Sequence, residues 1–141
     1  MDIEKQFKKM FNHAFNKMAK RYGCDKEEVQ IVLKANPEES FKNILIDVWV
    51  NYKVMEKDSE IMQVLNFMDS SLITTMGIDN KIADALVNIA ETNNVEKDDI
   101  KVPVIIRNEE IIMIAYNGNK PLLNENGKVK ILEFDEVVEL V

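Results

Sequence analysis

The fold class depends on residues 100–116, IKVPVIIRNEEIIMIAY, where the hydrophobic period changes from helical to alternating. Two β-branched runs, 102–107 and 111–116, flank the dipeptide Asn108-Glu109. Alternation of this kind predicts two strands, and the short Asn-containing link predicts a hairpin turn between them. Pro103 has no backbone N–H to donate, which predicts an edge position for the first strand.

A second hairpin is predicted downstream, at Asn126-Gly127, a dipeptide that favours a tight two-residue turn. It would join a short segment, 121–124, to a strand over 128–134. Residues 135–141 fit either a last strand or a helical turn. The chain beyond residue 95 therefore predicts a small antiparallel meander.

Before residue 95, apolar residues recur three and four positions apart, which is typical of amphipathic helices. The helix over 37–55 carries apolar residues on more than one side, so we expect it to be the most buried. Start signals, apolar periodicity and stop residues predict helices over residues 2–22, 26–34, 37–55, 59–76 and 80–92.

Together these patterns predict an α+β fold: an N-terminal bundle of about five helices followed by a small antiparallel β-meander. The 141 residues fit a single domain, 1–141, with a helical part over 1–95 and a β part over 96–141.

Charge is unevenly distributed along the chain, whose net charge is −7. Residues 1–34 hold eight Lys/Arg against five Asp/Glu, a balance of +3, so the remainder carries −10.

The single cysteine, Cys24, excludes an internal disulfide. The chain shows neither a secretory signal nor an apolar run of bilayer length, so we expect a cytoplasmic protein without a membrane partner.

Residues 15–34 resemble a helix-turn-helix DNA-binding unit. That resemblance implies a second helix over 26–34 lying in the major groove. The acids Asp25, Glu27 and Glu28 oppose phosphate binding, and any tight helical corner needs similar packing, so a helical corner stays open as the alternative. The residues that carry the resemblance are Met18, Ala19, Tyr22, Gly23, Cys24, Val29 and Val32. The DNA-binding candidates are Lys17, Lys20, Arg21, Lys26, Gln30 and Lys34.

No catalytic constellation stands out in the sequence. His13 is the only histidine and falls on the polar side of the first predicted helix, where we expect it in solvent. Adjacent acids such as Glu38-Glu39 fit helix starts and turns, and no Gly-rich phosphate loop is present. We therefore predict no catalytic residue, no metal site and no cofactor.

The leading functional prediction is a non-catalytic, acidic protein-binding module that acts as a regulator, inhibitor or immunity-like factor, with a nucleic-acid enzyme among the candidate partners. Acidic residues of the β part would steer a basic protein to it. The first alternative is a helix-turn-helix-like DNA-binding regulator using residues 15–34. The second is a small enzyme or ligand-binding domain with a pocket lined by Trp49, Tyr52, Arg107 and Tyr116. A homo-oligomer formed through the apolar stripe of 2–22 stays open. The partner-binding candidates are Glu109, Glu110, Glu133, Asp135 and Glu136.

Overall fold

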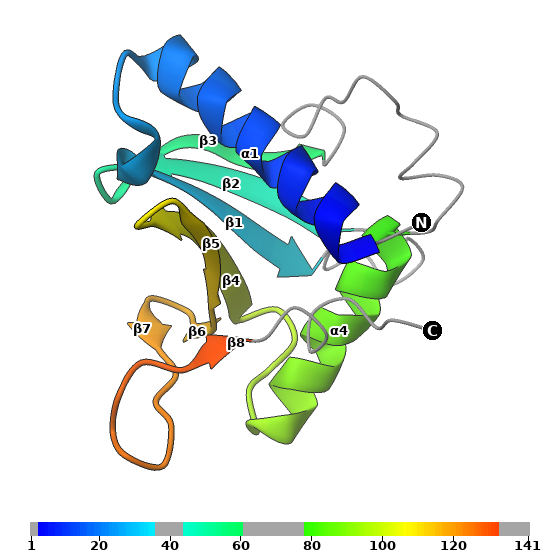
Figure 1. The fold of residues 1–141 in the computed structure, drawn as a ribbon. Helices are drawn as coiled ribbons and strands as arrows, with labels where there is room; N and C mark the ends of the chain where they lie inside the picture. The colour runs from blue at the N-terminus through cyan, green and yellow to red at the C-terminus, as the bar shows by residue number, and fades with distance from the viewer. Residues whose placement is uncertain (1–2, 36–43, 61–77, 133–141) are drawn as a thin grey trace.

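The computed structural model describes residues 3–35, 44–60 and 78–132 (Figure 1). Within them lie two α-helices, one 3₁₀ turn and eight strands. The elements are α1 (Ile3–Tyr22), η1 (Lys26–Glu28), β1 (Val29–Ala35), β2 (Ile44–Val50), β3 (Lys53–Glu60), α4 (Ile78–Thr92), β4 (Ile100–Arg107), β5 (Glu110–Ile114), β6 (Tyr116–Asn117), β7 (Lys120–Pro121) and β8 (Ile131–Leu132).

All described strands pair antiparallel in one sheet with the order β3-β2-β1-β4-β5-β8. The first three strands form a meander, and the chain returns through α4 to place β4 beside β1. The short strand β6 pairs with both β4 and β7. Strand β1 therefore lies inside the sheet, between β2 and β4.

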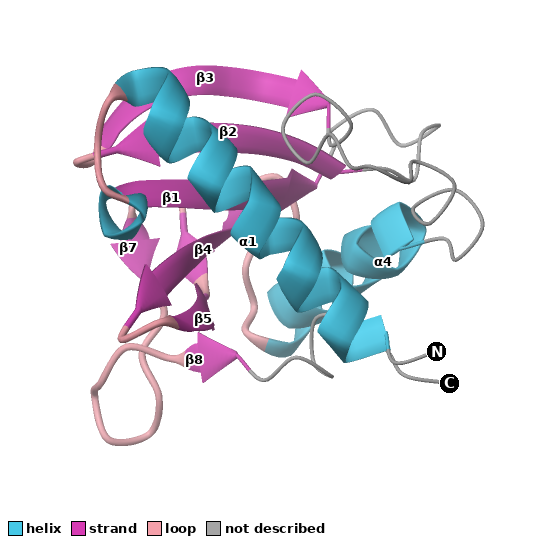
Figure 2. Cartoon of the chain, turned by 45° about the horizontal axis from the view of Figure 1, so that its top comes forward, coloured by secondary structure: helices cyan, strands magenta, loops and turns pink. Residues whose placement is uncertain are grey.

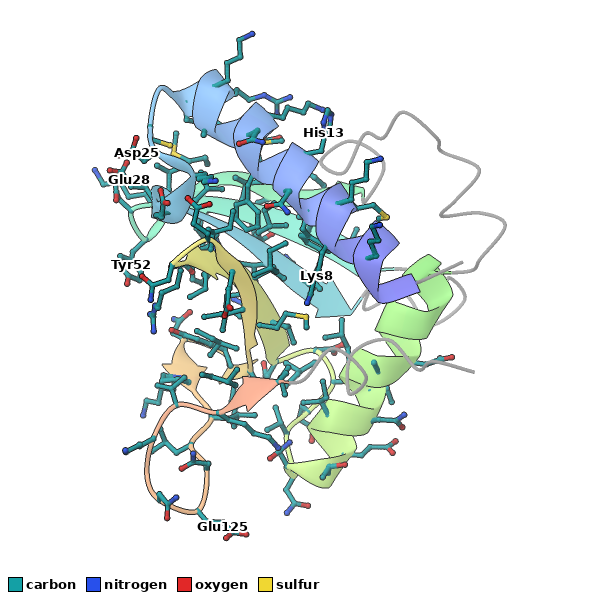
Figure 3. The ribbon with its side chains drawn as sticks, viewed as in Figure 1. Lys8, His13, Asp25, Glu28, Tyr52 and Glu125 are labelled. Atoms are coloured by element: carbon teal, nitrogen blue, oxygen red, sulfur yellow. The ribbon has the colours of Figure 1, made fainter. Side chains whose placement is uncertain are left out.

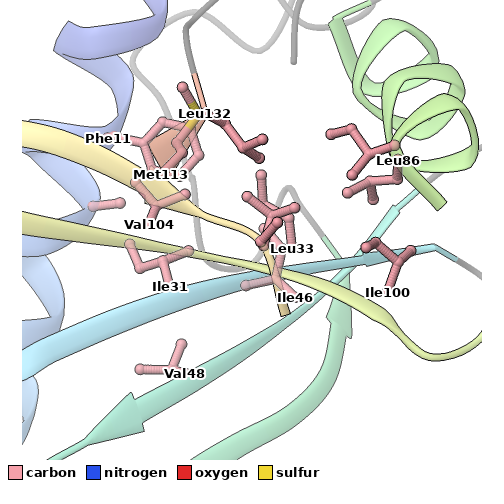
Figure 4. Close-up of a cluster of buried hydrophobic side chains, with 14 of the residues drawn as sticks. Phe11, Ile31, Leu33, Ile46, Val48, Leu86, Ile100, Val104, Met113 and Leu132 are labelled. Carbon is pink, nitrogen blue, oxygen red and sulfur yellow. The ribbon is translucent and has the colours of Figure 1, made fainter. Parts of the chain in front are cut away.

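Both helices pack on the same face of this sheet. Figure 2 shows α1 running across β1 and β2, with α4 near the N-terminal end of α1. The register places Ile31 opposite both Val48 and Val104, so alternate residues of β1, β2 and β4 point toward the helices. These side chains join one buried cluster (Figure 4), whose fully buried large members are Phe11, Phe15, Met18, Ile31, Leu33, Ile46 and Leu86.

The predicted five-helix bundle is wrong, because two of the predicted helices are strands. Residues 29–35 form β1 instead of a helix, and residues 44–50 form β2, where the longest helix was expected. Apolar residues on several sides of a helical wheel also describe a strand buried on both faces, and β-branched residues favour the strand. Because β1 pairs with a strand on each side, residues 29–35 form a strand and not a helix. The helix predicted over 59–76 overlaps β3 at its start and otherwise falls outside the described residues.

The first and last predicted helices are confirmed as α1 and α4. The predicted β4–β5 hairpin is also confirmed, with Asn108 and Glu109 as its turn. At the second hairpin, Asn124 Oδ1 accepts hydrogen bonds from the backbone N–H of Asn126 and Lys128, and Gly127 takes φ +74°. Both predicted segments of this hairpin are shorter than expected within the described residues: β7 is Lys120–Pro121, β8 is Ile131–Leu132, and Leu123 and Val129 form an isolated bridge between them.

Pro103 lies in an interior strand, so the predicted edge position for β4 is wrong. On one side, Pro103 pairs with Val32 of β1. On the other side, β4 pairs with β5 up to Val104–Met113 and with β6 from Lys101–Tyr116 onward. The β5 and β6 pairings share one register, so the gap between them falls beside Pro103. The proline is accommodated where the partner strand breaks between β5 and β6, at Ala115, whose backbone bonds to residues 122 and 130 instead.

The outer strand β3 carries two bulges. Two steps along β2, from Ile46 to Val48, match three along β3, and the next single step matches two. Bulges and exposed lysines such as Lys53 and Lys57 discourage another strand from pairing at a sheet edge.

Neither α1 nor α4, the two helices of the described residues, has the length and hydropathy that a membrane-spanning helix needs.

Candidate functional site

One end of the sheet brings together two hairpin turns and the residues that lead into β1. The β2–β3 turn is Asn51-Tyr52 and the β4–β5 turn is Asn108-Glu109. Asn51 donates its backbone N–H to the Glu28 carbonyl at 3.1 Å, which joins the first turn to η1, and η1 also contacts β4. We call residues 25–28, 51–55 and 107–110 the turn end. Figure 3 shows Asp25, Glu28 and Tyr52 gathered there.

Both turns have the same strained geometry. Asn51 and Tyr52 take φ +51° and +65°, and Asn108 and Glu109 take +52° and +67°. Two consecutive positive φ angles in a two-residue loop indicate a type I′ turn, which strongly favours Asn-Gly. Here the glycine position holds a tyrosine in one turn and a glutamate in the other. Bulky residues rarely adopt this conformation, so each turn displays a side chain at a cost in stability.

The displayed tyrosine is the most exposed large hydrophobic residue among those described. Tyr52 is 80% exposed, and Val54 and Met55 beside it are 52% and 46% exposed. An aromatic with neighbouring aliphatic side chains forms the kind of centre found in protein–protein interfaces. Tyr52 therefore offers a ready contact for a second protein.

Exposed acidic side chains lie at the same end of the sheet as Tyr52. Glu109 and Glu110 are exposed in and beside the β4–β5 turn, and Asp25 and Glu27 are exposed around η1. Three strand spacings separate the two turns, roughly 14 Å, which is well within one interface. Two of the predicted partner-binding residues, Glu109 and Glu110, thus lie at the turn end. The other three, Glu133, Asp135 and Glu136, fall outside the described residues.

A second polar feature lies on the sheet face opposite the helices. Lys34 of β1 pairs with Asp47 of β2 at 2.9 Å and also with Asp58 of β3. The side chain of Asp47 is only 4% exposed, and it accepts the backbone N–H of Asp58 at 2.9 Å. Asp58 sits in a bulge at φ +55°. The network thereby fastens the bulged edge strand to the two strands beside it.

The charges of this network keep Lys34 and Asp58 ionised near neutral pH. Burial lowers the pKa of Lys34, but hydrogen bonds to Asp58 and Asp47 outweigh it and raise that pKa overall. The hydrogen bond from Lys34 lowers the pKa of Asp58 below its usual value. A lysine held as an ammonium ion is a poor nucleophile, so the arrangement suits a structural tie better than covalent catalysis.

A comparable tie holds the end of α1 to β3. Glu56 accepts hydrogen bonds from the Arg21 guanidinium, at 2.7 Å, and from the Tyr22 hydroxyl. Burial, followed by the hydrogen bond with Glu56, raises the pKa of Tyr22. This contact orients α1 over the sheet next to the turn end.

The DNA-binding candidates do not form one surface. Lys17, Lys20 and Arg21 lie on α1, and Lys26 lies in η1. Gln30 and Lys34 lie on β1, where Lys34 is engaged in its ion pairs. The second helix of the predicted helix-turn-helix unit does not exist, because residues 29–35 are a strand. The helix-turn-helix interpretation is therefore wrong.

The four residues predicted to line a ligand pocket are also divided. Tyr52 and Arg107 belong to the turn end. Trp49 and Tyr116 lie in β2 and β6, with β1 and β4 between these strands. Lys101, paired with Tyr116, places its Nζ 5.8 Å from the centre of the Trp49 ring. The indole N–H of Trp49 is buried and has no hydrogen-bond partner among the described residues.

Side chains with reactive potential are scattered over the described part of the chain. His13 is exposed on α1, as predicted. Burial, together with the charges of Glu28 and Asp25, raises the pKa of the Cys24 thiol, which keeps it protonated at neutral pH. Within residues 3–35, 44–60 and 78–132, no group of three or more His, Cys, Asp or Glu side chains is arranged to hold a metal ion.

Comparison with protein-family models, with curated proteins and with solved structures found no match to this chain.

The sequence patterns did not predict the hairpin turn at Asn51-Tyr52, because this dipeptide lies inside the helix predicted over 37–55. A signal was present: an Asn between two β-branched runs, as in the Asn108 turn, marks a two-residue hairpin even without glycine.

Proposed function

We propose that this chain is a protein-binding module, and not an enzyme, which docks the turn end onto a basic surface of another protein. The observation that carries this proposal is Tyr52, 80% exposed at φ +65° in a turn that would be more stable with glycine. Backbone strain combined with an exposed aromatic side chain is a reason to infer a binding role.

The composition of the turn end supports docking onto a protein. Interfaces are enriched in Tyr and Met at their centre and in polar residues at their rim. Tyr52 and Met55 supply such a centre, and exposed acids, including Glu109, supply such a rim. A tyrosine contributes large contact area with few rotatable bonds, so little conformational entropy is lost when it is buried.

Charge indicates the chemistry of the partner. The whole chain carries −7, and the turn end holds five acids, Asp25, Glu27, Glu28, Glu109 and Glu110, against the three bases Lys26, Lys53 and Arg107. An excess of negative charge accelerates association with a positive surface and disfavours acidic partners. A regulator or inhibitor of a basic protein, such as a nucleic-acid enzyme, fits this charge.

The proposal can be tested by affinity capture with a matched pair of variants. The full chain is immobilised and exposed to cell lysate at 50 mM and 500 mM salt, next to Tyr52→Gly and Leu123→Ala. Leu123 is 57% exposed in the segment between β7 and β8, so its variant removes a comparable exposed side chain elsewhere.

The proposal predicts at least one protein that is captured by the wild type and by Leu123→Ala, is lost with Tyr52→Gly, and is reduced at high salt. Identical sets of proteins captured by all three chains would contradict it.

A further inference from the structure

The exposed face of α1 carries a row of basic and amide side chains. Its members are separated by three or four residues, so they follow one line along the helix for about 22 Å. All of them are exposed, while the opposite side of the helix packs Phe11, Phe15 and Met18 into the core. The row consists of Lys5, Lys9, His13, Asn16 and Lys20. Figure 3 marks its middle at His13.

This row belongs to a segment of unusual charge for this chain. Residues 5–22 contain six Lys/Arg and no Asp or Glu, a charge of +6. Because the whole chain carries −7, the other residues sum to −13. The positive charge is thus concentrated on one helix of an otherwise acidic protein.

The stability of the helix does not account for this concentration. Lys9 has Lys5 four residues before it, and Lys20 has Lys17 three residues before it. Neither Lys9 nor Lys20 has an acid three or four residues away. Like charges at these spacings destabilise a helix slightly. Lysines near the N-terminus also oppose the helix dipole, which favours acids there. A row that costs stability within the helix suggests a ligand outside it.

We propose that this face of α1, the basic row, binds the phosphate backbone of a nucleic acid without reading its sequence. Lysine ammonium groups neutralise phosphates, and the amides of Asn12 and Asn16, both exposed beside the lysines, can donate to phosphate oxygens. A lipid surface fits less well, because an interfacial helix needs a free apolar face and that of α1 is buried in the core.

This proposal uses α1 alone and differs from a helix-turn-helix mode, since no element enters a groove to read bases. It is also independent of the turn end, which carries acids and would avoid phosphates. Either proposal can therefore fail without affecting the other.

The test is a fluorescence-anisotropy titration of a labelled random-sequence DNA duplex with the full chain at several salt concentrations. The three lysines of the basic row, together with the half-buried Lys17 beside it on α1, predict a slope of log K against log salt of about −3.6. Affinity should accordingly fall about 150-fold between 50 and 200 mM salt.

The double variant Lys9→Gln/Lys20→Gln should reduce the slope to about −1.8. Lys120→Gln/Lys128→Gln removes two exposed lysines from the β6–β8 region and provides the matched control, which should keep the wild-type slope. Far-ultraviolet circular dichroism confirms that each variant is folded.

Absence of binding at 50 mM salt and 100 μM protein would overturn the proposal, and so would equal slopes for the two double variants. Vesicles containing 30% phosphatidylserine form the last arm. Binding to vesicles that requires Lys9 and Lys20, without binding to duplex, would also overturn it in favour of a membrane surface.

Discussion

Replacing Tyr52 by glycine should stabilise the protein while weakening its binding. The left-handed conformation costs an L-residue roughly 1–2 kcal/mol, and this strain disappears in Tyr52→Gly. Glycine also raises the conformational entropy of the unfolded chain, which offsets about 0.5–1 kcal/mol of that gain in stability. Little packing is lost, because the side chain is 80% exposed. The net result is a gain of about 0.5–1 kcal/mol, or about 2–3 °C in Tm for a chain of this length.

The same substitution should cost binding energy. An exposed tyrosine at the centre of an interface contributes about 2 kcal/mol or more, so Kd should rise about 30-fold or more. Stability is measured by urea unfolding, and affinity by titration of a protein that the wild-type chain captures. Opposite signs for stability and affinity would separate a binding role from a folding role.

Glu109→Gly provides the matched control, since Glu109 occupies the same position of the same kind of turn at φ +67°. It should gain similar stability but lose less than about tenfold in affinity, because a charge at the rim contributes little. A loss of stability in Tyr52→Gly relative to the wild type would show that the turn at Tyr52 is not strained. Equal affinities of Tyr52→Gly and Glu109→Gly would show that Tyr52 is not the centre of the interface.

Three further outcomes follow from the structure. Lys34→Met should lower the free energy of unfolding by roughly 3 kcal/mol, because it leaves Asp47 buried without its cation. Asp58→Asn should cost far less. Urea titrations that give equal losses for the two variants would contradict the tie between the strands. The pKa of Asp58 is lowered in the fold, so its contribution is present above the unfolded pKa and lost as pH falls through the folded value. Unfolding free energies measured from pH 6 to pH 2.5 should accordingly fall less steeply in Asp58→Asn than in the wild type, and parallel curves would count against this. Phe11→Ala should lower the free energy of unfolding by about 3–5 kcal/mol, because Phe11 is fully buried between α1 and the sheet. A melting temperature within 2 °C of the wild type would show that Phe11 does not lie in the core.

The helices and hairpins whose signals are local could be predicted from the sequence. The stripe of α1, the period of α4 and the turns at Asn108-Glu109 and Asn126-Gly127 each carry their own evidence within a few residues. The strands β1 and β2 could not be recognised in the same way. Their apolar residues face both sides of the sheet, which resembles a buried helix until the pairing partners are known.

The candidate site was predictable only in part, for the same reason. Glu109 and Glu110 followed from a local turn and from charge. Tyr52 lies at the same end as these residues only because β1 pairs with both β2 and β4 in registers that bring the two turns to one end of the sheet. Pro103 shows the converse: its missing N–H predicted an edge, yet a break in the neighbouring strand accommodates it within the sheet.

Photo-crosslinking tests the binding role of the turn end most directly. Tyr52 is replaced by p-benzoylphenylalanine, which keeps an aromatic ring at the tip of the turn, and Leu123 is replaced in the same way as the control. Each chain is irradiated in lysate at low salt. If the turn end binds a partner, position 52 should give a discrete crosslinked protein that is absent from position 123. No adduct at position 52, or the same adducts at both positions, would contradict it.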